Sequence, residues 1–123
     1  MDISNAATFS TSDAKHLLGQ LITKSQTEDV LVTHHGKPMA IIVSTQKYEK
    51  VFPHLELDAV FPLTDAKHYF SRVVKMSATH DVLVTFHGKP VSVIVSQPKY
   101  EDIMNCIREL ENQDELVLPP YEE

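Results

Sequence analysis

The sequence predicts an α+β fold in which two copies of one unit pack against each other within a single chain. Three observations lead to this prediction: an internal repeat, apolar residues at helical spacing in each copy, and two β-rich runs around a glycine turn in each copy. The length of 123 residues suits one ordinary domain or two very small ones. With 42% apolar and 23% charged residues, the composition is typical of a soluble globular protein.

The internal repeat covers most of the chain. A shift of 52 positions aligns residues 9–57 with residues 61–109 without a gap, and 22 of the 49 pairs are identical. Such self-similarity indicates a duplication. A unit of about 50 residues has little core of its own, so we expect the copies to form an intrachain pseudo-dimer that shares one sheet about a pseudo-two-fold axis. The predicted divisions are a first repeat (1–57), a second repeat (58–109) and an acidic tail (110–123).

Each unit begins with a short extended segment, 7–9 or 59–61, that leads into a helix. Ser12 and Thr64 are expected to cap these helices, because serine and threonine side chains accept a hydrogen bond from the first helical turn. The apolar positions that follow are 14, 17, 18, 21 and 22 in the first copy and 66, 69, 70, 73 and 74 in the second. This spacing predicts an amphipathic helix with one buried face.

A β-hairpin is expected next in each unit, because two apolar β-rich runs flank a His-Gly-Lys-Pro turn at 35–38 and 87–90. Gly36 and Gly88 are expected to adopt positive φ in these turns. A second helix should follow, with Tyr48 or Tyr100 as a core anchor that has a polar tip.

The second helix differs between the copies. Pro53 should end it in the first copy, whereas Asn105 takes that position in the second copy and lets the helix continue. The continued helix carries Ile103, Ile107 and Leu110 at i, i+4 and i+7, which predicts an apolar stripe. The chain then runs Leu116-Val117-Leu118-Pro119-Pro120-Tyr121, an apolar segment that is broken by prolines and is expected to become ordered on a partner.

Charge is divided unevenly along the chain. Residues 101–123 hold eight acids and one base, a net charge of −7, while residues 1–100 hold nine acids and ten bases, a net charge of +1; together they give the overall −6. A near-neutral body with an acidic tail suggests that the two parts have different partners.

Several classes of function are disfavoured. The apolar runs are shorter than the roughly 20 residues of a membrane span, and no secretory signal is visible, so a cytoplasmic protein is expected. Cys106 has no second cysteine to pair with and is expected to be a half-buried, inert thiol. The seven histidines lack metal-ligand spacing, and no nucleophile motif or isolated carboxylate pair is present. We therefore expect no cofactor, no metal and no enzymatic activity.

The repeated motifs resemble those of the Phd/YefM family of bacterial antitoxins. The resemblance rests on Asp-Ala-Lys at a helix start, Val-Leu-Val-Thr-x-His-Gly-Lys-Pro, an apolar strand and Lys-Tyr-Glu, and it covers about 100 of the 123 residues. Members are typically homodimers whose paired N-terminal α+β domains bind operator DNA and whose C-terminal segment neutralises a toxin. The resemblance implies that this chain is such a dimer fused into one polypeptide, with one neutralising tail.

The resemblance also implies which residues contact DNA. The family's Ser-Glu-Ala-Arg element matches Ser12-Asp13-Ala14-Lys15, so Lys15 and Lys67 replace an arginine and lose its bidentate fork. A second family arginine, just after the hairpin threonine, corresponds to His34 in one copy and Phe86 in the other. The implied DNA-binding set is Ser12, Lys15, His34, Lys37, Thr64, Lys67 and Lys89.

For the partner, the resemblance implies a cognate toxin bound by the C-terminal segment. The implied contacts are Ile107, Leu110, Leu116, Val117, Leu118 and Tyr121. The acidic residues around them would suit a small basic toxin. Two alternatives stay open at this point: a DNA-binding regulator without a toxin, and a protein-interaction module that has lost DNA binding. Further pairing of chains through a sheet edge is also left open.

Overall fold

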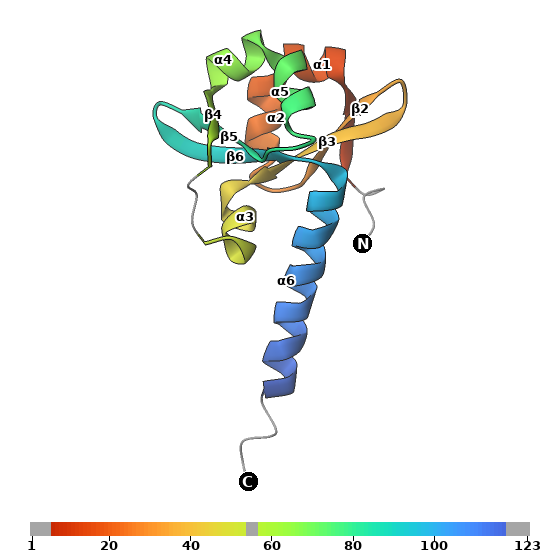
Figure 1. Ribbon diagram of the computed structural model, residues 1–123, viewed down its shortest axis with the longest axis vertical. Coiled ribbons are helices and arrows are strands. Elements are labelled where there is room, and N and C mark those ends of the chain that lie inside the picture. Colours follow the sequence, from red (N-terminus) through yellow and green to blue (C-terminus); the bar gives the residue numbers. More distant parts are fainter. Residues whose placement is uncertain (1–5, 54–56, 118–123) are drawn as a thin grey trace.

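The structure is a computed structural model that describes residues 6–53 and 57–117, with α6 described as backbone alone from residue 113 onward. The first unit contains β1 (Ala7–Ser10), α1 (Thr11–His16), α2 (Leu18–Lys24), β2 (Val30–His34), β3 (Lys37–Ser44) and α3 (Thr45–Val51). The second contains β4 (Ala59–Pro62), α4 (Leu63–His68), α5 (Phe70–Met76), β5 (Val82–Phe86), β6 (Lys89–Val95) and α6 (Gln97–Val117). The predicted α+β class and the repetition of one β/α unit are confirmed (Figure 1).

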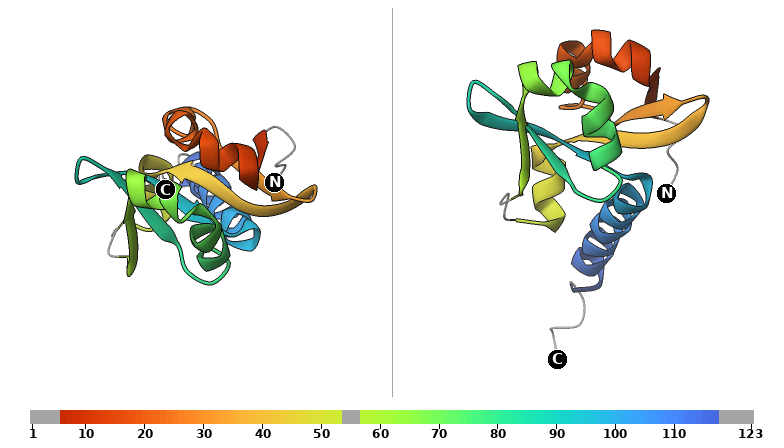
Figure 2. Two further views of the ribbon diagram at one scale, coloured as in Figure 1. Left: turned by 90° about the horizontal axis from the view of Figure 1, so that it is seen from above. Right: turned by 45° about the horizontal axis from the view of Figure 1, so that its top comes forward.

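The two units share one six-stranded sheet with the order β1-β2-β3-β6-β5-β4. Strands β3 and β6 join the units in antiparallel pairing, and Ile42 lies opposite Ile94, its own counterpart 52 positions later. A pseudo-two-fold axis therefore passes through this pair. Viewed from above, the two hairpins point to opposite sides of the molecule, as this axis requires (Figure 2).

Helices cover both faces of the sheet. Helices α1, α2, α4 and α5 form an upper layer, and α3 and α6 lie beneath the sheet (Figure 1). Because side chains alternate along a strand, Val30 and Val32 point into the upper core while Leu31 points into the lower one. The central strands are thus buried on both faces, which explains their uninterrupted apolar runs.

The first predicted helix of each unit is bent rather than straight. It divides into α1 and α2 at Leu17, whose φ of −108° and ψ of 16° depart from helical values. The same break occurs between α4 and α5 at Tyr69. Hydrogen bonds from Leu17 N to Asp13 O (2.9 Å) and from Leu21 N to Leu17 O (2.9 Å) cross the break. Leu17 thus keeps a backbone hydrogen bond to each of the two short helices where the chain changes direction.

The predicted N-caps of these helices are wrong. Ser12 and Thr64 lie inside α1 and α4, which begin at Thr11 and Leu63. Ser10 is the cap of α1, with extended backbone and a side-chain oxygen that accepts from Asp13 N at 3.1 Å. In the second unit Pro62 occupies this position and offers no side-chain acceptor. A cap must have extended backbone, and strand β1 continues as far as Ser10, so the cap falls two residues earlier than predicted.

The hairpin turns and the end of α3 agree with the sequence prediction. Gly36 and Gly88 have φ of 79° and 78°, and each follows a histidine that also has positive φ. Helix α3 ends at Val51, two residues before Pro53. Helix α6 continues to Val117 and is unbroken at residue 110, where the tail was predicted to begin.

Two matching clusters join the units beneath the sheet. Tyr48 on α3 donates a hydrogen bond to Asp81 of the second unit, and Tyr100 on α6 donates to Asp29 of the first. Each aspartate also pairs with a lysine of its own unit: Lys47 Nζ lies 2.8 Å from Asp29, and Lys99 Nζ lies 3.2 Å from Asp81.

These clusters also affect ionisation. Burial first, and then the bonded aspartate, raise the pKa of Tyr48 and of Tyr100 above their usual range. Both phenols therefore remain protonated as donors over the ordinary pH range. The prediction that the two tyrosines are core anchors is confirmed, and the structure adds a hydrogen bond from each hydroxyl.

Candidate nucleic-acid face and partner-binding helix

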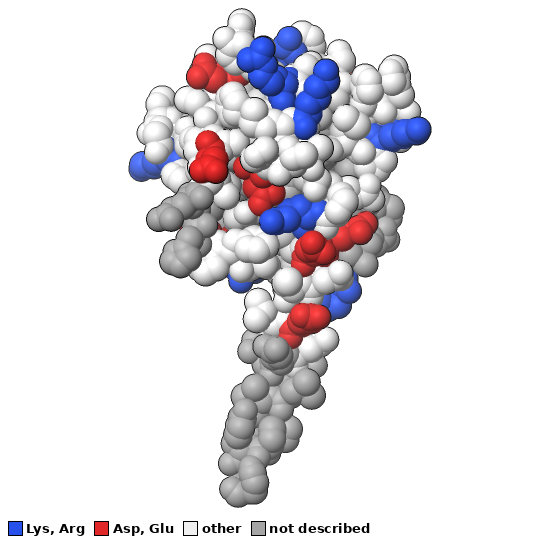
Figure 3. Space-filling view, in the orientation of Figure 1, with Lys and Arg blue, Asp and Glu red and all other residues white. Residues whose placement is uncertain are grey.

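The residues predicted to contact DNA all lie at the surface of the upper layer or of the hairpins. Ser12 and Lys15 are exposed on α1, and Thr64 and Lys67 are exposed on α4. The other three stand exposed at the hairpins: His34, Lys37 and Lys89. In Figure 3, lysine and arginine side chains gather at the top of the molecule, with single ones at the two hairpin tips.

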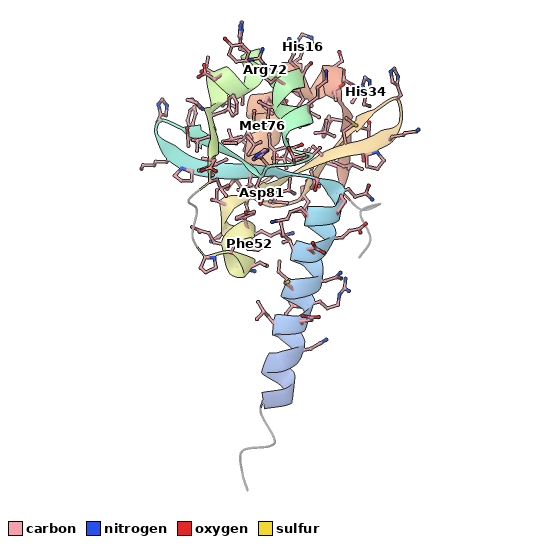
Figure 4. The ribbon with its side chains drawn as sticks, in the orientation of Figure 1. His16, His34, Phe52, Arg72, Met76 and Asp81 are labelled. Carbon is pink, nitrogen blue, oxygen red and sulfur yellow. The ribbon has the colours of Figure 1, made fainter. Side chains whose placement is uncertain are left out.

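Lys15 of the first unit meets two cations of the second. It lines a surface hollow of about 390 Å³ together with His68, Tyr69, Ser71, Arg72 and Lys75. This meeting depends on tertiary packing, because α1 contacts both α4 and α5 across the unit boundary. We call this site the cationic hollow; Arg72 marks its position at the top of the upper layer in Figure 4.

The Arg72 guanidinium is held by an aromatic neighbour. Its carbon lies 5.3 Å from the centre of the Tyr69 ring, within the range of a cation–π contact. Tyr69 is 44% exposed, so this contact orients Arg72 at the surface and leaves its N–H donors free to face solvent. A guanidinium presented in this way suits a phosphate or a guanine edge.

The cationic hollow continues towards the first hairpin. A smaller space of about 90 Å³ is lined by Thr11, His34, Met39, Ser71, Val74 and Lys75, and so shares two residues with the larger one. Thr11 Oγ1 lies 3.4 Å from His34 Nδ1, which ties the start of α1 to the hairpin. The structure thus places Lys15 and His34 of the predicted set at two adjoining surface spaces, which share Ser71 and Lys75.

The pseudo-symmetric counterpart of this smaller space lies in the other half and, among the described residues, is lined by no cationic side chain. An apolar hollow of about 430 Å³ is lined by Gly19, Ile22, Thr23, Gln26, Leu63, Phe86 and Val91. Phe86, 48% exposed, stands where the first hairpin has His34. Thr23 stands where the second unit has Lys75, so no cation reaches into this hollow from that position.

Sequence reasoning missed Arg72 and Lys75. The signal was available in the repeat alignment, because their counterparts in the first copy are the uncharged Gln20 and Thr23. The helical spacing assigned both positions to a solvent-facing surface, but it did not indicate that Lys15 would lie beside them.

Helix α6 is the candidate partner-binding element. It leaves the body beneath the sheet and extends well beyond α3 (Figure 1). Ile103 is fully buried and Ile107 is half-buried against the lower core, whereas Leu110 is 46% exposed. The predicted stripe therefore starts in the core of the body and ends at the surface.

Four acidic side chains in the described part of α6 face solvent. Glu101, Asp102, Glu109 and Glu111 are all exposed. Of the remaining predicted toxin contacts, Leu116 and Val117 lie in the helical backbone of α6, and Leu118 and Tyr121 lie outside the described residues. The described part of α6 is thus an acidic helix with one apolar edge.

Other kinds of site find little support in residues 6–53 and 57–117. Within these ranges no group of three or more His, Cys, Asp and Glu side chains is placed to hold a metal ion. None of the described helices has the length and apolar character needed to cross a membrane. Cys106 is half-buried on α6.

Comparison with known proteins agrees with the repeated architecture. The family described as "Antitoxin Phd_YefM, type II toxin-antitoxin system" matches the chain twice, over residues 7–52 and 58–116. A candidate antitoxin of Mycobacterium tuberculosis, Rv0268c, is 31% identical over 55 residues, which is 45% of this chain and 32% of that protein. The chain thus aligns with about a third of that relative's length.

No solved structure is similar enough to count as a match. The family match nevertheless covers both units and most of α6, the same elements that carry the motifs and the symmetric sheet. The chain belongs to the Phd/YefM antitoxins of type II toxin–antitoxin systems, with two copies of the family's unit in one polypeptide.

Proposed function

We propose that the chain neutralises a small, basic cognate toxin in the cytoplasm through the distal part of α6 and the residues that follow it. The observation that carries this proposal is the course of α6, whose apolar stripe is buried at Ile103 and exposed at Leu110. An amphipathic helix that projects from a rigid body suits recognition in a groove of a partner. Leu116, Val117, Leu118 and Tyr121 would extend the contact, and the surrounding acids would attract a basic surface.

The experiment that tests this role is capture of partners from the native cell with the full chain and with a chain that ends at Asn112. This truncation removes Leu116, Val117, Leu118 and Tyr121 but keeps Ile107, which packs on the lower core. We expect a small basic protein to be retained by the full chain alone. Equal capture by both chains, or capture by neither, would contradict the proposed neutralising segment.

Point variants refine this test. Leu110→Ser removes an apolar side chain that is 46% exposed on α6, and Val60→Ser removes one that is 47% exposed on the edge strand β4. Both changes remove similar exposed apolar surface, so they should affect stability little. The proposal expects weaker capture of the partner with Leu110→Ser and unchanged capture with Val60→Ser.

We further propose that the upper layer binds operator DNA and so represses the chain's own operon. Support comes from the exposure of the four matched lysines Lys15, Lys37, Lys67 and Lys89, with Ser12, Thr64 and His34 beside them. Lysines on phosphates release counterions, so four such contacts predict a slope of about −3.6 for log K against log salt. Absence of a complex with its own upstream DNA at low salt would contradict this role.

A further inference from the structure

We infer that DNA binding is one-sided: the cationic hollow makes the strongest contacts, and the operator that it reads lacks two-fold symmetry. This inference rests on the proposed DNA binding and adds Arg72 and Lys75 to the contacting residues. A homodimer presents identical surfaces to DNA, so its operator mirrors that symmetry. A fused pair is free of this constraint wherever its two units differ.

The two hollows differ at matched positions of the repeat. The side of the molecule that holds the cationic hollow and the adjoining small space differs from the other side at five matched positions. In repeat order these pairs are Thr11 and Leu63, His34 and Phe86, Ser71 and Gly19, Arg72 and Gln20, and Lys75 and Thr23. Every one of these exchanges removes a charge, a hydrogen-bonding group or polar bulk. These five exchanges share one direction, whereas Gln26 of the apolar hollow, matched by Ala78, runs the other way.

Charge follows the same division. Lys15, Arg72 and Lys75 converge on the cationic hollow. The matching positions in the other half are Lys67, Gln20 and Thr23, which provide a single cation. A further lysine of the first unit, Lys24, is engaged by Glu28 at 3.2 Å.

Acidic residues do not offset this imbalance. In the upper helices the acids are Asp13 and Asp65, one in each unit at the same repeat position. Both are exposed near the start of α1 or α4, so their repulsion of phosphate is similar on the two sides. The difference in potential therefore comes from the cations.

Packing also distinguishes the two sides. The space next to His34 and Lys75 is about 90 Å³, whereas the matched space next to Phe86 and Thr23 is about 430 Å³. The first is lined by His34 and Lys75, whose polar ends suit a phosphate, beside apolar side chains. The second presents the Phe86 ring, and its polar lining residues Thr23 and Gln26 donate to backbone carbonyls.

The test measures binding of a fluorescent duplex that carries the DNA immediately upstream of the coding frame, over a series of salt concentrations. The double variant Arg72→Gln/Lys75→Thr gives the second unit the residues of the first. We expect its log–log salt slope to be shallower than that of the unchanged chain by about 1.8, because two phosphate contacts are lost. The matched control Gln20→Ala/Thr23→Ala should leave the slope unchanged.

A second comparison uses residues that are identical in the two units. Lys15→Gln should weaken binding of the same duplex at least fivefold more than Lys67→Gln does. Ethylation interference should place the essential phosphates without a two-fold relation. All these positions are exposed, so thermal unfolding should confirm that each variant keeps the fold.

Three outcomes overturn the inference. An unchanged slope in the double variant shows that the cationic hollow is not the main contact, while the proposed DNA binding stands. Equal losses for Lys15→Gln and Lys67→Gln, or a symmetric interference pattern, restore two-fold recognition. No binding by the unchanged chain at 50 mM salt removes the inference together with the proposed operator role, and leaves the toxin-binding proposal untouched.

Discussion

The two copies of the repeat match each other on one face of the sheet and differ on the other. Beneath the sheet, each unit supplies a tyrosine, an aspartate and a lysine at the same repeat positions, and the same pairs form in both clusters. Above the sheet, the residues around the two hollows differ in charge, size and polarity. Contacts that hold the units together constrain both copies at once, whereas exposed surfaces can change one copy at a time.

The largest effect is expected from breaking the clusters beneath the sheet. Asp29→Ala and Asp81→Ala should each lower the free energy of unfolding by about 2–4 kcal/mol, because a largely buried acceptor is lost and its tyrosine and lysine remain unpaired. Thermal or urea unfolding measures both variants. Glu28→Ala, which removes an exposed ion pair, should change stability by less than about 0.5 kcal/mol and serves as the control.

Equal costs at Asp29 and Asp81 would support the symmetry of the lower face. A cost for either variant as small as that of Glu28→Ala would show that the corresponding cluster does not hold the units together.

Alkaline pH should reduce the stability that the tyrosine clusters beneath the sheet provide. The folded chain keeps both phenols protonated because their pKa is raised, while the unfolded chain releases these protons near pH 10. The contribution to stability is therefore complete below about pH 10 and is lost as the pH rises further. Between pH 9 and pH 11, the urea midpoint of unfolding should fall further in the unchanged chain than in Tyr48→Phe/Tyr100→Phe. Equal falls in both chains would contradict this reading.

The hairpin turns should respond alike in the two units. Gly36→Ala and Gly88→Ala are each expected to cost about 1 kcal/mol, because alanine is strained at φ near +79° and +78°. Gly19→Ala serves as a control that should change the free energy of unfolding in the opposite direction. This glycine lies in helix α2 with ordinary φ and free space for a methyl group among the described atoms, so the change should stabilise by up to about 1 kcal/mol. Unfolding midpoints measure all three variants.

The smallest effect on stability is expected at the diverged hairpin positions. Phe86→His should alter the free energy of unfolding by less than about 0.5 kcal/mol, since the ring is 48% exposed. The reverse exchange, His34→Phe, should weaken binding of the upstream duplex about 2- to 10-fold by removing a polar ring from the space that adjoins the cationic hollow. Equal DNA affinities for His34→Phe and the unchanged chain would exclude His34 from the contact.

Most of the fold followed from local patterns. The hairpin turns, the end of α3 before Pro53 and the continuation of α6 each depend on residues close together in the chain. The kinks at Leu17 and Tyr69 were not predicted, because apolar spacing reports which face is buried and is insensitive to a change of axis over one turn. The cap at Ser10 was missed because the end of a four-residue strand is hard to place from sequence.

The repeat at a spacing of 52 residues was sufficient to predict two matching units and one shared sheet, because duplication and periodicity are properties of the chain order. It could not show that Lys15 lies beside Arg72 and Lys75, or that Tyr48 reaches Asp81. These contacts join residues more than 30 positions apart and exist because β3 pairs with β6 and places the helices of one unit against those of the other. The sheet junction therefore creates the candidate DNA surface from side chains that the sequence holds far apart.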